Sequence, residues 1–492
     1  MELDQQKTPL FTGLKQYASK NPTPFHIPGH KKGQGMDPSY REFIGDNALS
    51  IDLINIAPLD DLHHPHGFIH EAQQLAAHAF GADYTFFSVQ GTSGAIMTMI
   101  MSVCKPGDKI IVPRNVHKSI MSAIIFSGAL PIFVHPVIDR THGIAHGVTT
   151  ESIQRAIEAH PDAKAVLVIN PTYYGFTCDL KEIVAIAHAA AIPVLVDEAH
   201  GVHTHFSKQL PISAMEAGAD MAATSVHKLG GSLTQSSVLN VKSGLVSVDH
   251  TTAIMSMLTT TSTSYILLAS LDAARKHLAI EGEKELKRVI ALAHSARKQL
   301  NEINGLHCIG EECLTSSATF AHDPTKLFIS LNELSISGYE AEVWLRDRYG
   351  IEVELSDLYN ILCIITLGDD QSKIDLLIKA MTELAASFQQ TDKQSISLSV
   401  KVPDIPTLAI SPRDAFYSQT EFVSFDQSAG RIIAEFIMVY PPGIPILSPG
   451  ELITQENLEY VKENMEAGLP VQGPEDQTLA FLKVIKEQSA IQ

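Results

Sequence analysis

From about residue 80 to residue 240, short β-rich apolar runs alternate with amphipathic stretches. The predicted strands are 84–89, 109–113, 131–136, 164–169, 192–197 and 221–225. The helix-like stretches between them include 93–104, 116–127, 150–160 and 179–190. This rhythm is typical of an α/β fold with a mostly parallel sheet covered by helices on both faces. Ligands bind such sheets outside the carboxyl ends of the strands, so polar residues at those ends are the first candidates for chemistry.

A long helical pattern over 265–301 is expected to lead out of this α/β region. Beyond it, we predict a helix in GYEAEVWLRDR, an alternating strand in IEVEL and an apolar strand in ILCIITL. The polar, proline-punctuated stretch 389–406 is a predicted linker, and YPPGIPILSPGE is a predicted rigid loop. The expected division is an N-terminal arm (1–70), a large domain (71–300), a smaller α+β domain (301–390) and a C-terminal domain (391–492).

Composition narrows the possible partners. The formal net charge of −19 argues against nucleic acid or an anionic membrane as a partner. No apolar run reaches the length of a membrane span, and the N-terminus lacks the basic start and apolar core of a signal peptide. The five cysteines are scattered without metal-ligand pairing, as expected for reduced thiols. We therefore expect a cytoplasmic protein.

Lys228 follows the predicted strand 221–225 and precedes Gly230 and Gly231. A lysine just past a buried strand can have a depressed pKa, which an amine needs in order to attack an aldehyde. Ser225 and His227 beside it can donate to a phosphate. The alternative is an ordinary turn whose lysine reaches the solvent.

Asp197 ends the predicted strand 192–197. Burying a carboxylate at the end of a core strand costs free energy unless a cation or several hydrogen-bond donors contact it. A protonated pyridine nitrogen would be such a cation. A metal ligand, a helix N-cap and a structural ion pair are the alternatives. The 31 residues from Asp197 to Lys228 leave room for one helix and one strand, so both tips can face one crevice.

Two predicted helix starts carry polar residues. Gly91-Thr92-Ser93-Gly94 opens an apolar helix, where backbone amides and hydroxyls form an anion site that suits a phosphate, although simple capping explains the pattern equally. His117 opens the helix after the strand 109–113. Its imidazole could stack on a planar ring, or it could be a capping or core histidine.

The 22 histidines suggest a metal site, mainly around HHPHGFIH (63–70) and HGVHTHF (200–206). No cysteine pairing or closed ligand set accompanies either segment, so no metal is expected. Neither a Walker loop nor a GxGxxG fingerprint precedes a helix, which argues against nucleotide enzymes.

Taken together, the sequence motifs of this chain resemble those of the fold-type-I, pyridoxal-phosphate (PLP) dependent ornithine/lysine/arginine decarboxylases. The chain is especially similar to the biosynthetic arginine decarboxylases of Gram-positive bacteria, over its whole length. The sequence motifs that carry the resemblance are FHIPGHKKGQGMDP, VQGTSGAIMTM, PRNVHKS, INPTYYG, VDEAHGVH, TSVHKLGGSLTQSS, LTTTSTSY, GIEVELSDLYN, SPRDAF and YPPGIPILSPGE. The resemblance implies a large domain of the aspartate aminotransferase type and a smaller α+β C-terminal domain.

The resemblance also implies roles for individual residues. Lys228 would hold PLP as a Schiff base, Asp197 would pair with the pyridine nitrogen and His117 would stack on the ring. His200 and Lys228 are the proton donors under consideration. The remaining predicted cofactor contacts are Thr92, Ser93, Ala199, Ser225 and His227.

Three further residues concern the partner subunit and the substrate. Thr260, in LTTTSTSY, would reach the phosphate from the neighbouring subunit, which implies a homodimer with its active site at the interface. Glu354 would meet the distal cation of the substrate, with Asp357 close by. The family's larger acid-inducible members carry Ser-Pro where this chain has Ser262-Thr263, and they also have an N-terminal wing domain that we do not expect in this protein.

The implied reaction is decarboxylation of L-arginine to agmatine and CO₂, a first step towards polyamines such as spermidine. Lysine or ornithine is the nearest alternative substrate, because chain length is read by side-chain geometry. An aminotransferase would need an arginine to clamp the retained α-carboxylate, for which Arg413 and Arg431 are the candidates. A catalytically inactive binding protein is disfavoured by the intact Lys228 and Asp197.

Overall fold

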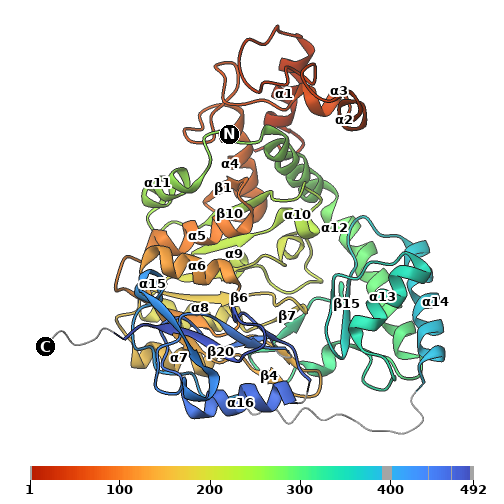
Figure 1. The fold of residues 1–492 in the computed structure, drawn as a ribbon. Helices are drawn as coiled ribbons and strands as arrows, with labels where there is room; N and C mark the ends of the chain where they lie inside the picture. The colour runs from red at the N-terminus through yellow and green to blue at the C-terminus, as the bar shows by residue number, and fades with distance from the viewer. Residues whose placement is uncertain (1–2, 390–401, 441–442, 467, 488–492) are drawn as a thin grey trace, which may run out of the picture. The chain divides into compact units, whose positions relative to one another are not determined.

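The computed structural model describes residues 3–389, 402–440, 443–466 and 468–487 (Figure 1). The predicted linker therefore lies mostly outside the described residues, as do two prolines of the predicted Pro/Gly loop. The chain divides into two compact units, each built from two stretches of sequence. The first unit comprises residues 1–103 and 191–288, and the second comprises 104–190 and 289–492.

In the first unit, four strands form a sheet in the order β1-β10-β9-β8. Their bounds are β1 Tyr84–Ser88, β8 Val194–Asp197, β9 Met221–Thr224 and β10 Ser237–Val241. Strand β8 runs parallel to β9, whereas β10 is antiparallel to both β9 and β1. In the parallel pair, Asp197 is in register with Ala223, so β8 and β9 end at the same edge of the sheet.

The helices of this unit are α1 Pro9–Ser19, α2 Pro38–Ile44, α3 Asp46–Ser50, α4 Phe68–Phe80, α5 Gly91–Val103, α9 Ala214–Ala217, α10 Val226–Leu229, α11 Val248–Leu258 and the first part of α12 Tyr265–Asn301. Helix α5 packs against β9, β10 and α11. Most of its residues are buried because the apolar sequence AIMTMIMSV faces the sheet on one side and α11 on the other. The long helix α12 continues from this unit into the second one.

The second unit contains three parallel strands in the order β6-β2-β3. These strands are β2 Lys109–Pro113, β3 Leu130–Val134 and β6 Ala165–Ile169. The accompanying helices are α6 Lys118–Ser127, α7 Thr150–Ala159 and α8 Leu180–Ala189. Each helix has a side chain that caps its N-terminus, from His117, Thr149 and Asp179 respectively.

A four-stranded antiparallel sheet with the order β11-β13-β15-β14 follows along the chain. Its strands are β11 His307–Ile309, β13 Lys326–Ser330, β14 Leu355–Ser356 and β15 Asn360–Ile364. Apolar residues of these strands share one core with α13 Gly338–Tyr349, α14 Gln371–Ser387 and the end of α12. Short elements complete this part: β4 Ile138–Asp139, β5 Ile144–Ala145, β7 Phe176–Thr177 and β12 Ala321–His322.

The C-terminal part forms two small sheets, β16-β20 and β18-β17-β19, around an apolar core of its own. The elements are α15 Pro412–Tyr417, β16 Thr420–Ser424, β17 Ile437–Val439, β18 Ile444–Leu447, α16 Gln455–Glu466, β19 Val471–Gln472 and β20 Phe481–Ile485. Arg114, which follows β2, forms a buried ion pair with Glu451 and donates to the carbonyls of Pro445 (2.8 Å) and Ile446 (3.2 Å). The loop that contains SPGE is therefore bound to the end of a core strand.

The six predicted strands and four predicted helices of the α/β region are confirmed to within two residues at each end. Strand β10 was not predicted. Because it is antiparallel to its neighbours, the sheet of the first unit is mixed. The prediction for IEVEL was wrong, since only Leu355 belongs to a strand. Pairing of β14 with β15 begins at Leu355, where it faces Leu362.

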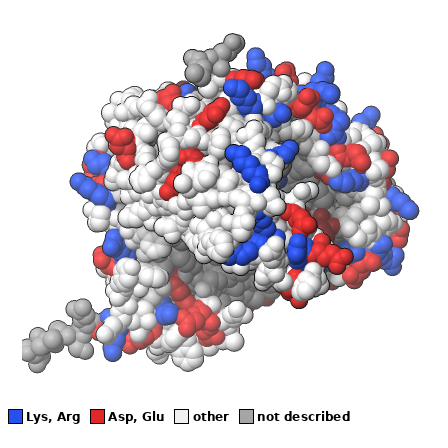
Figure 2. Space-filling view, turned by 90° about the horizontal axis from the view of Figure 1, so that it is seen from above, with Lys and Arg blue, Asp and Glu red and all other residues white. Residues whose placement is uncertain are grey.

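Among the helices in the described ranges, none is both long enough and apolar enough to cross a bilayer. On the face seen from above in Figure 2, basic and acidic side chains are interspersed around a broad uncharged area. This face therefore carries charges of both signs.

Candidate active site

Lys228 lies in the single turn of α10, directly after β9. Its Nζ atom is 2.8 Å from Nε2 of His200, a buried residue in the turn that follows β8. The expectation of a buried amine was wrong, because the Lys228 side chain is exposed within the single chain. The reason is that α10 emerges beyond the end of the sheet, so that its lysine lies at the rim while its neighbour Val226 is buried. The contact with His200 nevertheless orients the amine.

Asp197 lies at the end of β8 and is 5% exposed. Burial raises its pKa to about 6, although the backbone N–H of Ala199, 3.2 Å away, and the positive charge of Lys228 act in the opposite direction. Electrostatic coupling to Lys228 means that the two residues lie near each other. A buried carboxyl with this pKa is suited to meet a cationic N–H group.

A cluster of three buried hydroxyls lies at the start of α5. The Thr92 hydroxyl is hydrogen-bonded to that of Ser225 and, at 2.8 Å, to that of Ser237. The first amides of a helix have no partner within the helix, so this end of α5 offers N–H and O–H donors together. Ser93, in the same turn, is exposed. Ser237 was missed by the sequence analysis, although it lies in the TQSS sequence that continues the lysine motif.

One ring nitrogen of His227 is occupied by a hydrogen bond to the backbone. Its Nδ1 atom donates to the carbonyl of Ser236 at 2.9 Å, which leaves Nε2 for another partner. Ser236 itself is fully buried.

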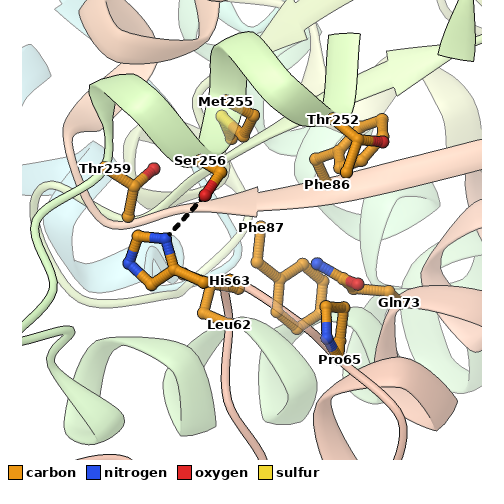
Figure 3. Close-up of a pocket in the computed structure, with 10 residues that line it drawn as sticks. All are labelled: Leu62, His63, Pro65, Gln73, Phe86, Phe87, Thr252, Met255, Ser256 and Thr259. Carbon is orange, nitrogen blue, oxygen red and sulfur yellow. Dashed lines mark hydrogen bonds between the residues drawn. The ribbon is translucent and has the colours of Figure 1, made fainter. Parts of the chain in front are cut away.

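Thr260 is exposed in the segment between α11 and α12. Its carbonyl accepts a hydrogen bond from Nε2 of His63 at 3.1 Å, while Nδ1 of His63 lies 2.9 Å from the hydroxyl of Ser256 on α11. Figure 3 shows this histidine among the residues that line a pocket, which also include Phe87, Met255 and Thr259. His63 thus fixes the backbone beside Thr260, a role that no sequence motif indicated.

His117, in the second unit, caps helix α6. Its Nδ1 atom accepts from the backbone N–H of Ser119 at 3.2 Å, and the ring is exposed. The capping interpretation is therefore confirmed.

Glu354 is an exposed residue just before β14. Its carboxylate accepts a hydrogen bond from the hydroxyl of Tyr173, which belongs to the INPTYYG sequence after β6. Burial and the neighbouring Glu354 raise the pKa of Tyr173, so its hydroxyl keeps its proton. One oxygen of the Glu354 carboxylate is thus bound by Tyr173, and the side chain remains exposed to solvent.

Asp357, in contrast, is 6% exposed and bound within its own turn. Its carboxylate accepts from the backbone N–H groups of Tyr359 and Asn360, both at 2.8 Å, and from the side chain of Asn360 at 3.0 and 3.1 Å. Burial raises its pKa. These contacts make Asp357 a turn-stabilising residue within the chain.

The histidine-rich segments do not gather ligands in the part of the chain that the structure describes. His205 instead donates to Glu198 at 2.7 Å, and His66 Nδ1 lies 2.9 Å from the carbonyl oxygen of His64. The two arginines considered as carboxylate clamps are also engaged locally. Arg413 donates to the carbonyl of Phe126, and Arg431 is paired with Glu421 and Glu487.

Comparisons with known proteins agree with this picture. The family model for the major domain of Orn/Lys/Arg decarboxylases matches residues 8–373, and the model for the C-terminal domain matches 397–473. The chain is 66% identical to an arginine decarboxylase of Bacillus anthracis, covering 99% of both chains. It is 64% identical to an arginine decarboxylase of Bacillus subtilis, covering 100% of both.

Solved structures show the same fold. The lysine decarboxylase LdcF of Francisella novicida superposes with a TM-score of 0.83 at 23% identity, covering 97% of this chain and 81% of that one. A structure described as SPT with PLP superposes with a TM-score of 0.52 at 16% identity, covering 65% of this chain and 76% of that one. The fold is that of the PLP-dependent fold-type-I enzymes, as the sequence predicted.

Proposed function

This chain belongs to the Orn/Lys/Arg decarboxylase family, and we propose that it decarboxylates L-arginine, giving agmatine and CO₂. Full-length relatives at 64–67% identity are arginine decarboxylases, whereas the lysine decarboxylases of Escherichia coli are 25–27% identical. The geometric observation that carries the proposal is the contact between Lys228 and His200 beside the buried Asp197. Agmatine is a precursor for polyamines, including spermidine.

The residues present fit PLP as the cofactor. The hydroxyls of Thr92, Ser225 and Ser237 at the start of α5 suit a phosphate, and the buried carboxyl of Asp197 suits the N–H of a pyridinium ring. When bound, PLP withdraws the electron pair that the departing carboxylate leaves on Cα. Ser93, Ala199 and His227 are the remaining proposed contacts.

Lys228 is the proposed covalent attachment point. Its amine lies within hydrogen-bond distance of His200, and only its deprotonated form is nucleophilic. His200 is suited to take a proton from the Lys228 amine and to return one. Since decarboxylation replaces CO₂ by a proton at Cα, this pair is the proposed source of that proton.

Asp197 contributes through its charge. With a pKa of about 6 in the cofactor-free chain, the carboxyl can ionise when a cationic partner offsets its burial. His117, an exposed residue at the start of α6, is the proposed stacking residue.

Glu354 is the proposed acid for the substrate's guanidinium group. A carboxylate can accept two parallel hydrogen bonds from a guanidinium, and Tyr173 fixes its orientation. Asp357 would act on the same group only indirectly, through the turn that it stabilises.

A homodimer with a shared active site is part of the proposal. Thr260 is exposed and its backbone is fixed by His63, as expected for a residue that contacts the partner's phosphate group.

In the proposed domain division, residues 71–300 bind the cofactor, 301–390 carry Glu354, and 1–70 and 391–492 complete the subunit. A cytoplasmic location is supported by five free cysteines.

The test is a parallel assay of CO₂ release from L-arginine, L-lysine and L-ornithine by the purified holoenzyme. We expect arginine to give the highest kcat/KM and agmatine to equal CO₂ in amount. Keto-acid formation without CO₂ would identify an aminotransferase and contradict the proposal. A preference for lysine or ornithine would reassign the substrate.

A further inference from the structure

A cluster of metal-ligating side chains lies in the second unit, outside the residues assigned above. Asp139 ends β4, His142 lies in the hairpin turn that follows, and Cys313 ends the 3-10 turn Glu311–Cys313. One ligand atom from each of these three residues lies within 4.8 Å of the others. The sequence analysis expected no metal because it considered only the segments 63–70 and 200–206.

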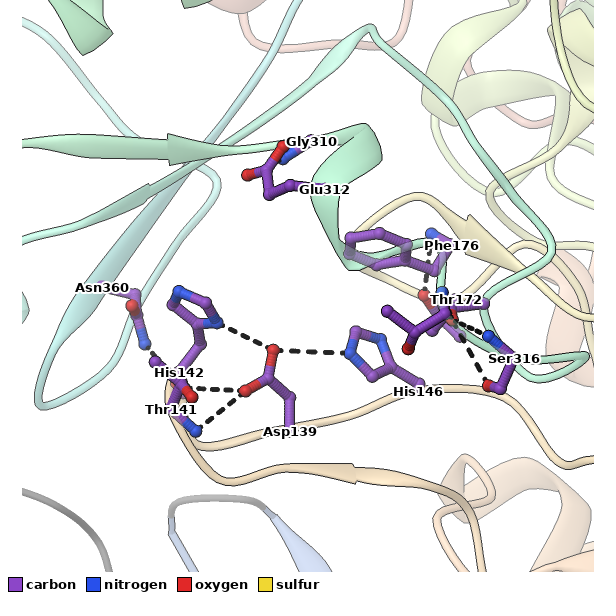
Figure 4. A network of polar contacts seen from close by, with 12 residues as sticks. Asp139, Thr141, His142, His146, Thr172, Phe176, Gly310, Glu312, Ser316 and Asn360 are labelled. Carbon is purple, nitrogen blue, oxygen red and sulfur yellow. Dashed lines mark hydrogen bonds and ion pairs between the residues drawn. The ribbon is translucent and has the colours of Figure 1, made fainter.

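The hairpin holds Asp139 in place. Its Oδ1 atom accepts from the backbone N–H groups of Thr141 (2.9 Å) and His142 (3.1 Å), and its Oδ2 atom accepts from Nδ1 of His142 at 2.7 Å. Nε2 of His146 is 3.6 Å from the same Oδ2 atom (Figure 4). All three side chains are at most 13% exposed. The two imidazoles therefore converge on one nearly buried carboxylate.

Cys313 brings a thiol to this group. This thiol is partly buried and lies near the negative charges of Asp139 and Glu312. The negative potential of these two carboxylates favours a bound cation. Glu312, which accepts from His307 at 3.0 Å, adds a further charge close by.

We propose that Asp139, His142 and Cys313 form a binding site for a zinc ion. Carboxylate oxygen, imidazole nitrogen and thiolate sulphur together suit Zn²⁺, whereas Mg²⁺ and Ca²⁺ prefer sites made of oxygen alone. Zn²⁺ bonds of about 2.0–2.3 Å place tetrahedral ligand atoms roughly 3.3–3.7 Å apart. Side-chain rotations that move the ligand atoms by about 1 Å are therefore enough to reach this spacing. Binding releases the thiol proton of Cys313 to solvent, the proton of His142 that faces Asp139 moves to the other ring nitrogen, and a water completes the fourth position.

Two further residues, His146 and Asn360, contact the hairpin that carries Asp139 and His142. His146 packs edge-on against Phe176, with ring centroids 4.6 Å apart, and its buried Nδ1 atom has no hydrogen-bond partner among the described residues. Asn360 donates to the carbonyl of His142 at 2.9 Å and also to the carboxylate of Asp357. The zinc site is thereby joined to the turn that follows Glu354.

The test uses the intact holoenzyme under reducing conditions, stripped of metal with EDTA and titrated with Zn²⁺ against a chromogenic chelator. We expect one equivalent per chain, and a loss of affinity of more than about 100-fold in Cys313→Ser and in His142→Ala, because even outer contacts account for 10- to 100-fold. His250→Ala, an exposed histidine on α11, is the matched control and should bind as the wild type does. Absence of binding by the wild type, or unchanged binding by either ligand variant, would overturn the proposal.

A second measurement needs no substitution. Among the five cysteines, which all lie within the described ranges, Cys313 alone is not buried, so alkylation of the native enzyme reports on it. Stoichiometric Zn²⁺ should slow this alkylation at least about 10-fold, and Co²⁺ in its place should produce a thiolate-to-metal absorption band. An alkylation rate that is indifferent to Zn²⁺ would also overturn the proposal.

Discussion

Nζ of Lys228 lies 2.8 Å from Nε2 of His200, although the two residues are 28 positions apart in the sequence. Each follows a strand, and the parallel pairing of β8 with β9 brings the two strand ends to one edge. A lysine that is hydrogen-bonded to an imidazole can exchange a proton without a mobile water. This pair is therefore the part of the proposed site that substitutions should probe first.

Replacement of Lys228 by alanine should remove the covalent attachment of PLP and lower CO₂ release from arginine by about 10³-fold or more. The measurements are the visible absorbance of the purified protein and the rate of CO₂ release. Lys208→Ala changes an exposed lysine in the same unit and should leave both unaltered. Near-normal turnover of the Lys228 variant would exclude it as the attachment point.

Asp197→Asn should change how the stability of cofactor-free protein depends on pH. The folded-state pKa of Asp197, about 6, is above the ordinary aspartate pKa of 3.8. The stability that its neutral form provides is therefore complete below about pH 4 and is lost as the pH rises through about 6. This difference between the two pKa values corresponds to roughly 3 kcal/mol. Denaturant titrations at pH 4.5 and 7 should show a smaller difference between the two pH values for the variant than for the wild type.

Glu354→Gln should raise the KM for arginine about 10- to 100-fold with unchanged PLP content, because it removes a charged hydrogen-bond acceptor. Tyr173→Phe should have a smaller effect in the same direction. Asp357→Asn should mainly lower the melting temperature, since its carboxylate stabilises a turn. If Asp357→Asn alone raised KM, the guanidinium acid would have to be reassigned.

Thr260 can be tested by subunit mixing. We expect Thr260→Ala to weaken PLP retention, and Lys228→Ala to be inactive. If Thr260 serves the partner's site, co-expression of the two variants should form mixed dimers in which one of two sites is intact. Activity that stays at the level of the separate variants would place Thr260 in its own subunit's site.

Glu451→Gln should destabilise the protein by about 3–5 kcal/mol, because it leaves the buried guanidinium of Arg114 without its charge partner. The free energy of unfolding from denaturant titration is the measurement. Glu456→Gln, at the start of α16, alters an exposed acid and should be nearly neutral. An equal effect of both changes would argue against a structural role for the ion pair.

Much of the fold was predictable from the sequence because strand and helix periodicity is local. The run KIIVP at 109–113 and the helix 265–301 are observed with the predicted bounds. Strand β10 was missed, because SVLNV contains a buried asparagine that hydrogen-bonds to Thr85 and Thr224, and only the folded sheet satisfies it. The metal cluster was missed for a similar reason, as Cys313 is 171 residues from His142 in sequence.

The sequence by itself determined the family, the order of the elements and the residue types at the strand ends. Only the tertiary structure decided which side chains meet: that Lys228 is exposed yet contacts His200, that Tyr173 orients Glu354 and that Asp357 is occupied by its own turn. The physical reason is that periodicity depends on neighbouring residues, whereas convergence of side chains depends on strand register and packing between distant segments.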